Sequence, residues 1–179
     1  MTLPDLDVPR HDAVALTRAL VRIDSRNPTL AAGAPGEARI AHAFGGLLES
    51  WGFSVDIADS APGRPNVIAR IGPENTPAMM FVGHLDTVGV EGMTHDPFSG
   101  DMADGRLYGR GSADMKSGLA AISVAAARAL DELGKTPERQ IIIAAVTDEE
   151  YESIGMRALL DAGVRAECAI LTEPTRRAI

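Results

Sequence analysis

The segment from Gln140 to Val146 constrains the fold more than any other part of the chain. Its letters, QIIIAAV, form a continuous apolar run that contains β-branched isoleucines. Strands with one solvated face alternate apolar and polar residues, whereas a run without alternation is typical of a central strand in a parallel sheet, which is buried on both faces. The segment therefore predicts a sheet that is covered by other elements on both sides.

Helical and strand patterns alternate along the rest of the chain. Apolar residues at helical spacing predict helices over 12–23, 37–51, 114–133 and 154–162. Period-two alternation or short apolar runs predict further strands over 53–57, 66–71, 78–83 and 167–171. A long loop, 89–105, contains a predicted turn at Asp104-Gly105. The fold class that follows is α/β, in three layers, with a mixed and largely parallel sheet flanked by helices.

Composition limits the partners and the compartment. The formal net charge of -8 argues against nucleic acid and anionic membranes, which bind basic surfaces. No apolar run has the length of a bilayer span, and the acidic, proline-broken N-terminus does not resemble a signal peptide, so we expect a soluble cytoplasmic protein. Cys168 is the single cysteine, which excludes a disulfide framework and a cysteine-based zinc finger. It lies in an apolar run, and we expect it to be reduced and buried.

A histidine and an aspartate follow directly after the apolar run 78–83, in the letters FVGHLD. Side chains alternate along a strand, so His84 and Asp86 are expected to point the same way. An imidazole can bind a metal while a neighbouring carboxylate accepts the other ring N–H and fixes the tautomer. An isolated HxD more often marks a surface histidine paired with an aspartate at a strand end, so the interpretation depends on the motifs downstream.

A glycine-rich turn, 109–114, delivers Asp114 to the start of the predicted long helix. An ordinary N-cap is the alternative role for Asp114. The following Lys116-Ser117 resembles the end of a phosphate-binding loop, but Met115 stands where that motif requires glycine. The turn therefore predicts a carboxylate site rather than a nucleotide site.

Two more acidic motifs follow predicted strands. TDEE, 147–150, comes directly after the central run, at the kind of strand end where open α/β sheets bind ligands. Its alternative is a solvated first turn of the next helix, which the helix dipole would favour. TEPT, 172–175, follows the last strand and by itself indicates only a surface turn.

Together these motifs place carboxylates and one imidazole at a single edge of the sheet. Adjacent carboxylates repel each other unless a cation or a proton resolves the conflict. The donor set suits a hard or borderline divalent cation, zinc above all. So many acids exceed the needs of one ion, and two bridged ions about 3.5–4 Å apart fit better.

Four runs of the sequence, in this order, resemble the acetylornithine deacetylase/succinyl-diaminopimelate desuccinylase family of dizinc metallopeptidases. They are FVGHLDTV, DPFSGDMADGRLYGRGSADMKSG, VTDEEYESIG and TEPT. The same family includes aminoacylases and glutamate carboxypeptidases. The resemblance extends from the Asn27-Pro28 loop to Thr175 and so covers most of the chain.

The resemblance implies a role for each acidic motif. The metal ligands that it implies are His84, Asp114, Glu150 and Glu173. In this assignment Asp114 bridges two zinc ions and precedes a cis peptide bond to Met115. Glu173 belongs to the first ion with His84, and Glu150 belongs to the second. The implied catalytic residues are Glu149, the general base, and Asp86, which orients the imidazole.

The activity implied by the resemblance is zinc-dependent hydrolysis of an amide bond. The expected substrates are N-acyl amino acids such as N-acetylornithine or N-succinyl-diaminopimelate, with a small-peptide carboxypeptidase as a related possibility. Cobalt or manganese are possible substitutes for zinc. Intact members of the family are often homodimers, and a small-molecule substrate is the expected partner, with no nucleic acid and no membrane.

Members of the family are longer than this chain. Their catalytic domain is interrupted after the position of Glu173 by a lid or dimerisation domain, and it then resumes with a late histidine for the second zinc. We therefore expect residues 1–179 to be the N-terminal part of that catalytic domain, without the lid, and to expose apolar surface. All four histidines, at 11, 42, 84 and 95, precede Glu173, and His95 is the candidate substitute for the late one. A truncated, non-catalytic metal-binding fragment, or one part of a split protein, is the alternative function.

Overall fold

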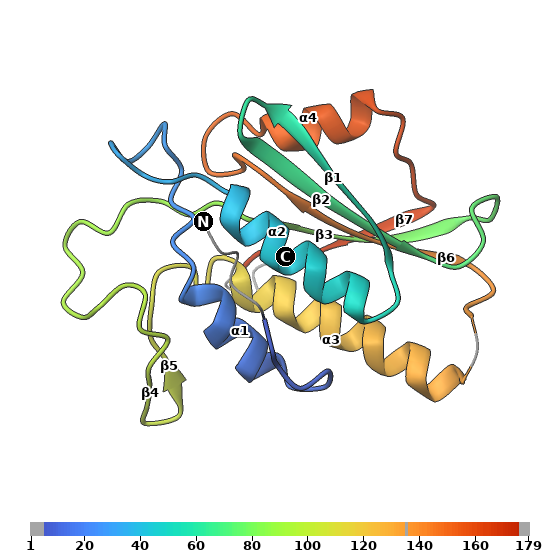
Figure 1. Ribbon diagram of the computed structural model, residues 1–179, viewed down its shortest axis with the longest axis horizontal. Coiled ribbons are helices and arrows are strands. Elements are labelled where there is room, and N and C mark those ends of the chain that lie inside the picture. The colour runs from blue at the N-terminus through green and yellow to red at the C-terminus, as the bar shows by residue number, and fades with distance from the viewer. Residues whose placement is uncertain (1–5, 135, 176–179) are drawn as a thin grey trace.

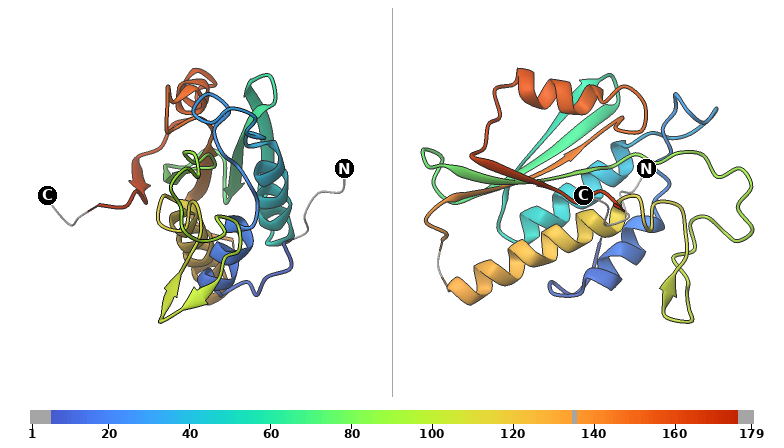
Figure 2. Two further views of the ribbon diagram at one scale, coloured as in Figure 1. Left: turned by 90° about the vertical axis from the view of Figure 1, so that its left-hand side faces the viewer. Right: turned by 180° about the vertical axis from the view of Figure 1, so that it is seen from behind.

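A sheet between two layers of helices forms the protein, as the computed structural model of residues 6–134 and 136–175 shows (Figure 1). The helices are α1 (Ala13–Val21), α2 (Ala38–Ser50), α3 (Lys116–Leu133) and α4 (Ile154–Asp161). The main sheet contains β1 (Ser54–Ala61), β2 (Arg64–Ile71), β3 (Ala78–His84), β6 (Gln140–Val146) and β7 (Cys168–Leu171). Helices α1, α2 and α3 lie on one face of this sheet and α4 lies on the other (Figure 2). None of the described helices has the length and apolar character that crossing a membrane requires.

The main sheet is mixed, with the strand order β1-β2-β6-β3-β7. Strand β3 pairs in parallel with both β6 and β7, and β2 pairs antiparallel with β1 and with β6. Only β2 therefore runs against the other strands of this sheet. The predicted α/β class with a flanked, largely parallel sheet is confirmed, and the run 140–146 is its central strand.

The burial of β6 explains its unbroken apolar sequence. Ile143 and Ala145 join the core under α1, α2 and α3, whereas Ile142, Ala144 and Val146 join the core under α4. Alternate side chains thus enter opposite cores, so neither face of the strand meets water. Full burial of each isoleucine contributes about 1.5–3 kcal/mol.

The element ends follow local signals in the sequence. The Asp12 carboxylate accepts hydrogen bonds from the main-chain N–H groups of Val14 and Ala15, at 3.0 and 2.9 Å, and so caps α1. The predicted turn at Asp104-Gly105 is confirmed, with φ angles of 51° and 71°. It joins β4 (Met102–Ala103) to β5 (Arg106–Leu107), a short hairpin within the region expected to be only loop.

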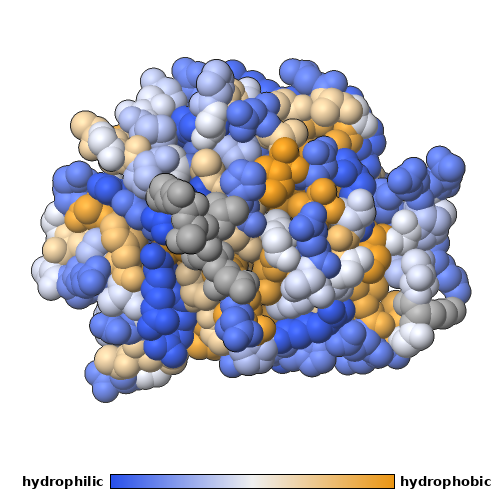
Figure 3. All heavy atoms as spheres, viewed as in Figure 1, coloured by the Kyte–Doolittle hydropathy of each residue, from blue (hydrophilic) through white to orange (hydrophobic). Residues whose placement is uncertain are grey.

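Strand β7 corrects the expectation for Cys168. All four of its residues are exposed, and the Cys168 thiol is free and exposed rather than buried. The reason is that β7 lies at the edge of the sheet and, among the described residues, pairs only with β3. Ile170 and Leu171 are 45% and 61% exposed, as expected for a chain with uncovered apolar surface. Figure 3 shows hydrophobic residues reaching the surface among hydrophilic ones on another face of the molecule.

We expect the Cys168 thiol to react in the native chain with a disulfide reagent such as dithionitrobenzoate. About one thiol per chain should react without denaturant, because reactivity follows accessibility and the thiol is exposed. The released thiolate is measured by its absorbance, with the Cys168→Ser variant as the blank. A thiol that reacts only after unfolding would contradict the exposed edge strand.

Candidate metal centre

Three parallel strands deliver acidic and imidazole side chains to one edge of the sheet. His84 ends β3, Glu149 and Glu150 follow β6, and Glu173 follows β7. Because β6 and β7 both pair in parallel with β3, these residues leave the sheet at the same edge. The predicted convergence of the motifs is therefore what the topology produces.

Asp114 reaches this edge from the start of α3, which packs closely on β3. A Cβ atom at Gly83 would lie 2.7 Å from Leu119 Cδ2, so glycine in the strand leaves room for the side chains of the helix to pack closely on it. The Asp114–Met115 peptide bond is cis, as the resemblance implies. The N-cap position of α3 is Met115, so the alternative role of Asp114 as an ordinary N-cap is wrong.

The His84 side chain is buried, and both of its ring nitrogens face oxygen atoms. Nδ1 lies 2.9 Å from the main-chain oxygen of Asp86 and 3.6 Å from Oδ1 of the same residue. Nε2 lies 3.0 Å from Asp114 Oδ1, 3.5 Å from Glu173 Oε1 and 3.8 Å from Glu149 Oε2. A carbonyl oxygen at Nδ1 requires a proton there, which leaves Nε2 to face the acids.

The Asp86 carboxylate is fully buried and accepts hydrogen bonds from the segment after β6. The main-chain N–H of Glu149 donates to Oδ1 at 3.0 Å, and that of Glu150 donates to Oδ2 at 3.2 Å. The Asn27 side-chain amide donates to Oδ2 at 2.8 Å. Asp86 therefore holds the main chain of the two glutamates, while its own main-chain carbonyl makes the shorter contact with His84.

Two overlapping groups of side chains in the described part of the chain have the spacing of a metal site. They are His84 with Glu149 and Glu173, and His84 with Asp114 and Glu150. Within each group the potential ligand atoms lie within 4.8 Å of one another. All four side chains that we predicted as ligands are included, and the predicted base Glu149 is included as well.

Burial and mutual repulsion perturb the charges of this cluster. Burial raises the pKa of Glu150, and the charges of Asp114, Asp86 and Glu149 raise it further against the opposing effect of His84. Burial also raises the pKa of Glu173, together with the charges of Asp114 and Glu149 and again against His84.

The pKa of the His84 imidazole is raised as well, although burial acts on it in the opposite direction. Burial alone would lower the pKa of His84, but the charge of Asp86, the hydrogen bond with Asp114 and the charges of Glu173 and Glu149 together raise it. The cluster thus holds more negative charge than one imidazole can balance. A divalent cation would supply the missing positive charge, so these residues fit a metal.

The segment 147–150 does not have its alternative role as the first turn of a helix. Helix α4 begins at Ile154 with Ser153 as its N-cap, so the TDEE segment is not the first turn of that helix. Asp148 is also buried rather than solvated. The TEPT segment does lie outside regular structure, but it brings Glu173 within 3.5 Å of His84.

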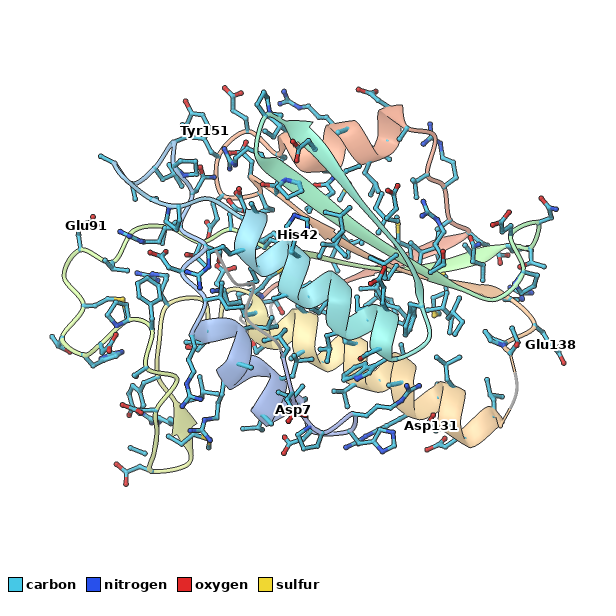
Figure 4. All side chains as sticks on the ribbon, viewed as in Figure 1. Asp7, His42, Glu91, Asp131, Glu138 and Tyr151 are labelled. Carbon is cyan, nitrogen blue, oxygen red and sulfur yellow. The ribbon has the colours of Figure 1, made fainter. Side chains whose placement is uncertain are left out.

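The other histidines lie apart from the cluster. His11 Nε2 lies 2.6 Å from Asp131 Oδ2 at the exposed end of α3, and His42 is exposed on α2 (Figure 4). His95 packs edge-on against the Tyr108 ring, with 5.3 Å between the ring centroids. In residues 6–134 and 136–175, neither potential ligand group contains His95, the candidate substitute ligand.

Sequence reasoning missed several buried polar residues beside the site. Lys116 is fully buried and donates from Nζ to the Ile23 carbonyl at 2.8 Å. Burial lowers the pKa of Lys116 to about 7, against the opposing charge of Asp24. Its ammonium group is thus held inside the protein, in agreement with the rejection of a nucleotide site from the sequence.

In the sequence Asn27 stood only in the Asn27-Pro28 loop, and no motif marked Arg64. In the structure Arg64 pairs with the buried Glu37, and with Asp148, which also contacts Asn27. Burial alone would raise the pKa of Asp148, but hydrogen bonds from Asn27, the Glu152 main chain and Arg64 lower it. No local pattern marks these contacts, because the partners are far apart in the sequence.

Comparison with known proteins identifies similar sequences and folds. The model of the family described as "Peptidase family M20/M25/M40" matches residues 80–178. A succinyl-diaminopimelate desuccinylase of Methylorubrum extorquens (strain PA1) is 37% identical over 177 residues, which covers 92% of this chain and 44% of that relative. The chain therefore spans less than half the length of this relative.

Solved structures share the fold at lower sequence identity. An M20 family metallo-carboxypeptidase from Sulfolobus solfataricus matches 90% of this chain and 37% of its own chain, with a TM-score of 0.77 and 20% identity. The YXEP protein of Bacillus subtilis, described as a dinuclear metal binding peptidase from the M20 family, matches 89% of this chain and 40% of its own. Its TM-score is 0.58 at 19% identity.

Proposed function

Because the chain belongs to peptidase family M20/M25/M40, we propose that it acts as a metal-dependent amide hydrolase on N-acyl amino acids. The observation that carries the proposal is the cluster of His84 with carboxylates from three separate segments at one sheet edge. The relationship to a desuccinylase makes N-succinyl-diaminopimelate the first substrate to test, followed by N-acetylornithine and small peptides. A cytoplasmic location and action on small molecules belong to the same proposal.

The proposed metal is zinc, held as two ions, with cobalt or manganese as substitutes. His84, Asp114, Glu150 and Glu173 would hold the ions. The dinuclear description of the Bacillus subtilis protein supports a pair of ions, and the excess of carboxylates over imidazole supports it independently. A bound divalent ion supplies positive charge that acidifies water and polarises a substrate carbonyl.

Glu149 is the proposed general base. Its main chain is fixed by the hydrogen bond to Asp86 Oδ1, while its side chain is 44% exposed and reaches the open side of the site. From there a carboxylate oxygen of Glu149 takes a proton from the attacking water and returns it to the leaving nitrogen. The Asp86 carbonyl holds the proton of His84 on Nδ1 throughout.

A small cavity beside the proposed base offers room for part of a substrate. Its volume is about 180 Å³, and Glu149 and Glu173 line it together with apolar side chains. The apolar lining residues are Val82, Val146, Met156 and Leu171. We assign this cavity to the methylene groups of an acyl chain, next to the carboxylates that act on the amide.

The zinc content of the purified chain tests the proposed centre. We expect the wild-type chain to retain zinc after dialysis, and the Glu150→Ala variant to retain about one ion fewer per chain. Plasma emission spectrometry measures the metal. Glu152→Ala is the matched control, because Glu152 lies in the same exposed segment but belongs to neither potential ligand group. Equal zinc content in all three chains would overturn the assignment of Glu150.

A non-catalytic metal-binding role is the second candidate. It is favoured by the single imidazole in the described cluster. We propose that residues 1–179 correspond to the N-terminal part of the family's catalytic domain. A chain that binds zinc but hydrolyses neither acyl amino acids nor dipeptides would support this second function over the first.

A further inference from the structure

Five polar residues form a buried network behind the proposed metal centre, which we call the Asn27 network. Its members are Asn27, Glu37, Arg64, Asp86 and Asp148. The Arg64 guanidinium donates to both carboxylate oxygens of Glu37, at 2.5 and 2.6 Å, and to Asp148 Oδ1 at 3.1 Å. Arg64 is the only cation among these members, so three carboxylates share one positive charge.

The Asn27 side chain joins the two carboxylates nearest the site. Its Nδ2 donates to Asp86 Oδ2 at 2.8 Å and to Asp148 Oδ1 at 2.9 Å, which uses both of its N–H groups. Its Oδ1 accepts the Thr29 main-chain N–H at 3.0 Å. This last contact fixes which end of the amide faces the acids.

The two carboxylates in turn fix the segment that carries the proposed base and ligand. The Asp86 carboxylate accepts hydrogen bonds from the main-chain N–H groups of Glu149 and Glu150. Asp148 Oδ2 accepts the Glu152 N–H at 3.2 Å, and Asp148 itself has a φ of 60°, a conformation that costs energy for a residue with a side chain. Contacts from Asn27 and Arg64 hold Asp148 in that conformation.

An amide suits this position better than a cation would. Two buried carboxylates that face one another need donors, because unpaired buried charges are costly. A lysine or arginine would satisfy them but would add positive charge beside the metal centre and weaken its attraction for a cation. The neutral amide supplies two donors and leaves the negative charge of the site unchanged.

We propose that Asn27 is a positioning residue of the metal centre. By holding Asp86 and Asp148 together it fixes the main chain of Glu149 and Glu150, and thus the placement of base and ligand. The link to metal affinity rests on the proposed function, whereas the fixing of the main chain can be measured without metal. Removing a residue that positions metal ligands through hydrogen bonds typically lowers metal affinity about 10–100-fold.

The Asn27→Asp variant tests the proposal, because it keeps the shape of the side chain and removes both donors. We expect the amide protons of Glu149 and Glu150 to exchange about tenfold faster than in the wild type, measured by NMR without metal. We expect the zinc affinity, measured by calorimetry, to fall about 10–100-fold. If N27D does not fold, Asn27→Ser, which retains one hydroxyl donor, should show both effects in the same direction.

Asn66→Asp is the matched control. Asn66 is also a buried asparagine beside the segment after β6, but its contacts are the Gly155 carbonyl at 2.8 Å and the Thr147 N–H at 3.0 Å. In the described part of the chain, the Asn66 side chain makes no hydrogen bond with Asp86 or Asp148. We expect N66D to lower stability while both amide exchange and zinc affinity stay close to those of the wild type.

The outcomes separate this inference from the proposed function. Unchanged exchange of both amides in a folded Asn27 variant would overturn the positioning role. Faster exchange with unchanged zinc affinity would overturn its link to the metal centre. A wild-type chain that binds no zinc would overturn the proposed function, while the exchange rates would still decide whether Asn27 fixes the segment.

Discussion

Replacing Arg64 by methionine should lower the free energy of unfolding by about 3–5 kcal/mol. The guanidinium is 12% exposed and lies between the Glu37 and Asp148 carboxylates, whose side chains are 0% and 3% exposed. Methionine retains much of the apolar stem but leaves two buried negative charges without their cation. Chemical denaturation, followed by circular dichroism, measures the change.

Two further variants make the test of Arg64 specific. Arg139→Met removes an arginine whose pair with Glu167 is exposed, so we expect a much smaller effect. Adding Glu37→Gln to the Arg64 variant should recover part of the loss, because one of the stranded charges disappears. A destabilisation by Arg64→Met no larger than that of Arg139→Met would show that the buried pair contributes little.

Replacing Glu149 by glutamine should reduce hydrolysis of N-succinyl-diaminopimelate about 10²–10⁴-fold while the chain retains its zinc. Glutamine keeps the size of the side chain and its place beside the Asp86-bound main chain, but it cannot accept the proton of the attacking water. Initial rates of amine release at saturating substrate measure the effect. Zinc content is measured on the same preparation.

The zinc measurement distinguishes two roles for Glu149. Its Oε2 lies 3.8 Å from His84 Nε2, and it belongs to one of the two potential ligand groups. If the variant loses activity but keeps its zinc, the role of Glu149 as the base is supported. If zinc is lost together with activity, Glu149 is a metal ligand. Glu152→Gln, in the same exposed segment, should change neither quantity.

The architecture was predictable because local side-chain patterns report burial. The unbroken apolar run of β6 required two covered faces, and Ile142 and Ile143 do enter the two opposite cores. Asp12 stood at the position of a helix cap and makes the cap hydrogen bonds. The clustering of His84 with the three acidic motifs was predictable for a related reason, since parallel strands end at the same edge of a sheet.

Other features had no local signal. Cys168 was expected to be buried from its apolar neighbours, but its strand lies at the sheet edge, and strand order is a property of long-range pairing. The same holds for the Asp86 carboxylate, whose partners Asn27, Glu149 and Glu150 come from two distant segments.

The sequence by itself determined the α/β alternation, the positions of most elements and the chemistry gathered at one edge of the sheet. Only the tertiary structure decided which buried residues position the side chains of the proposed metal centre. Strand β2 runs against β6, so Arg64 at its start lies beside the segment after β6 and reaches Asp148. Side-chain periodicity encodes burial locally, whereas the pairing of buried charges depends on distant segments that packing brings together.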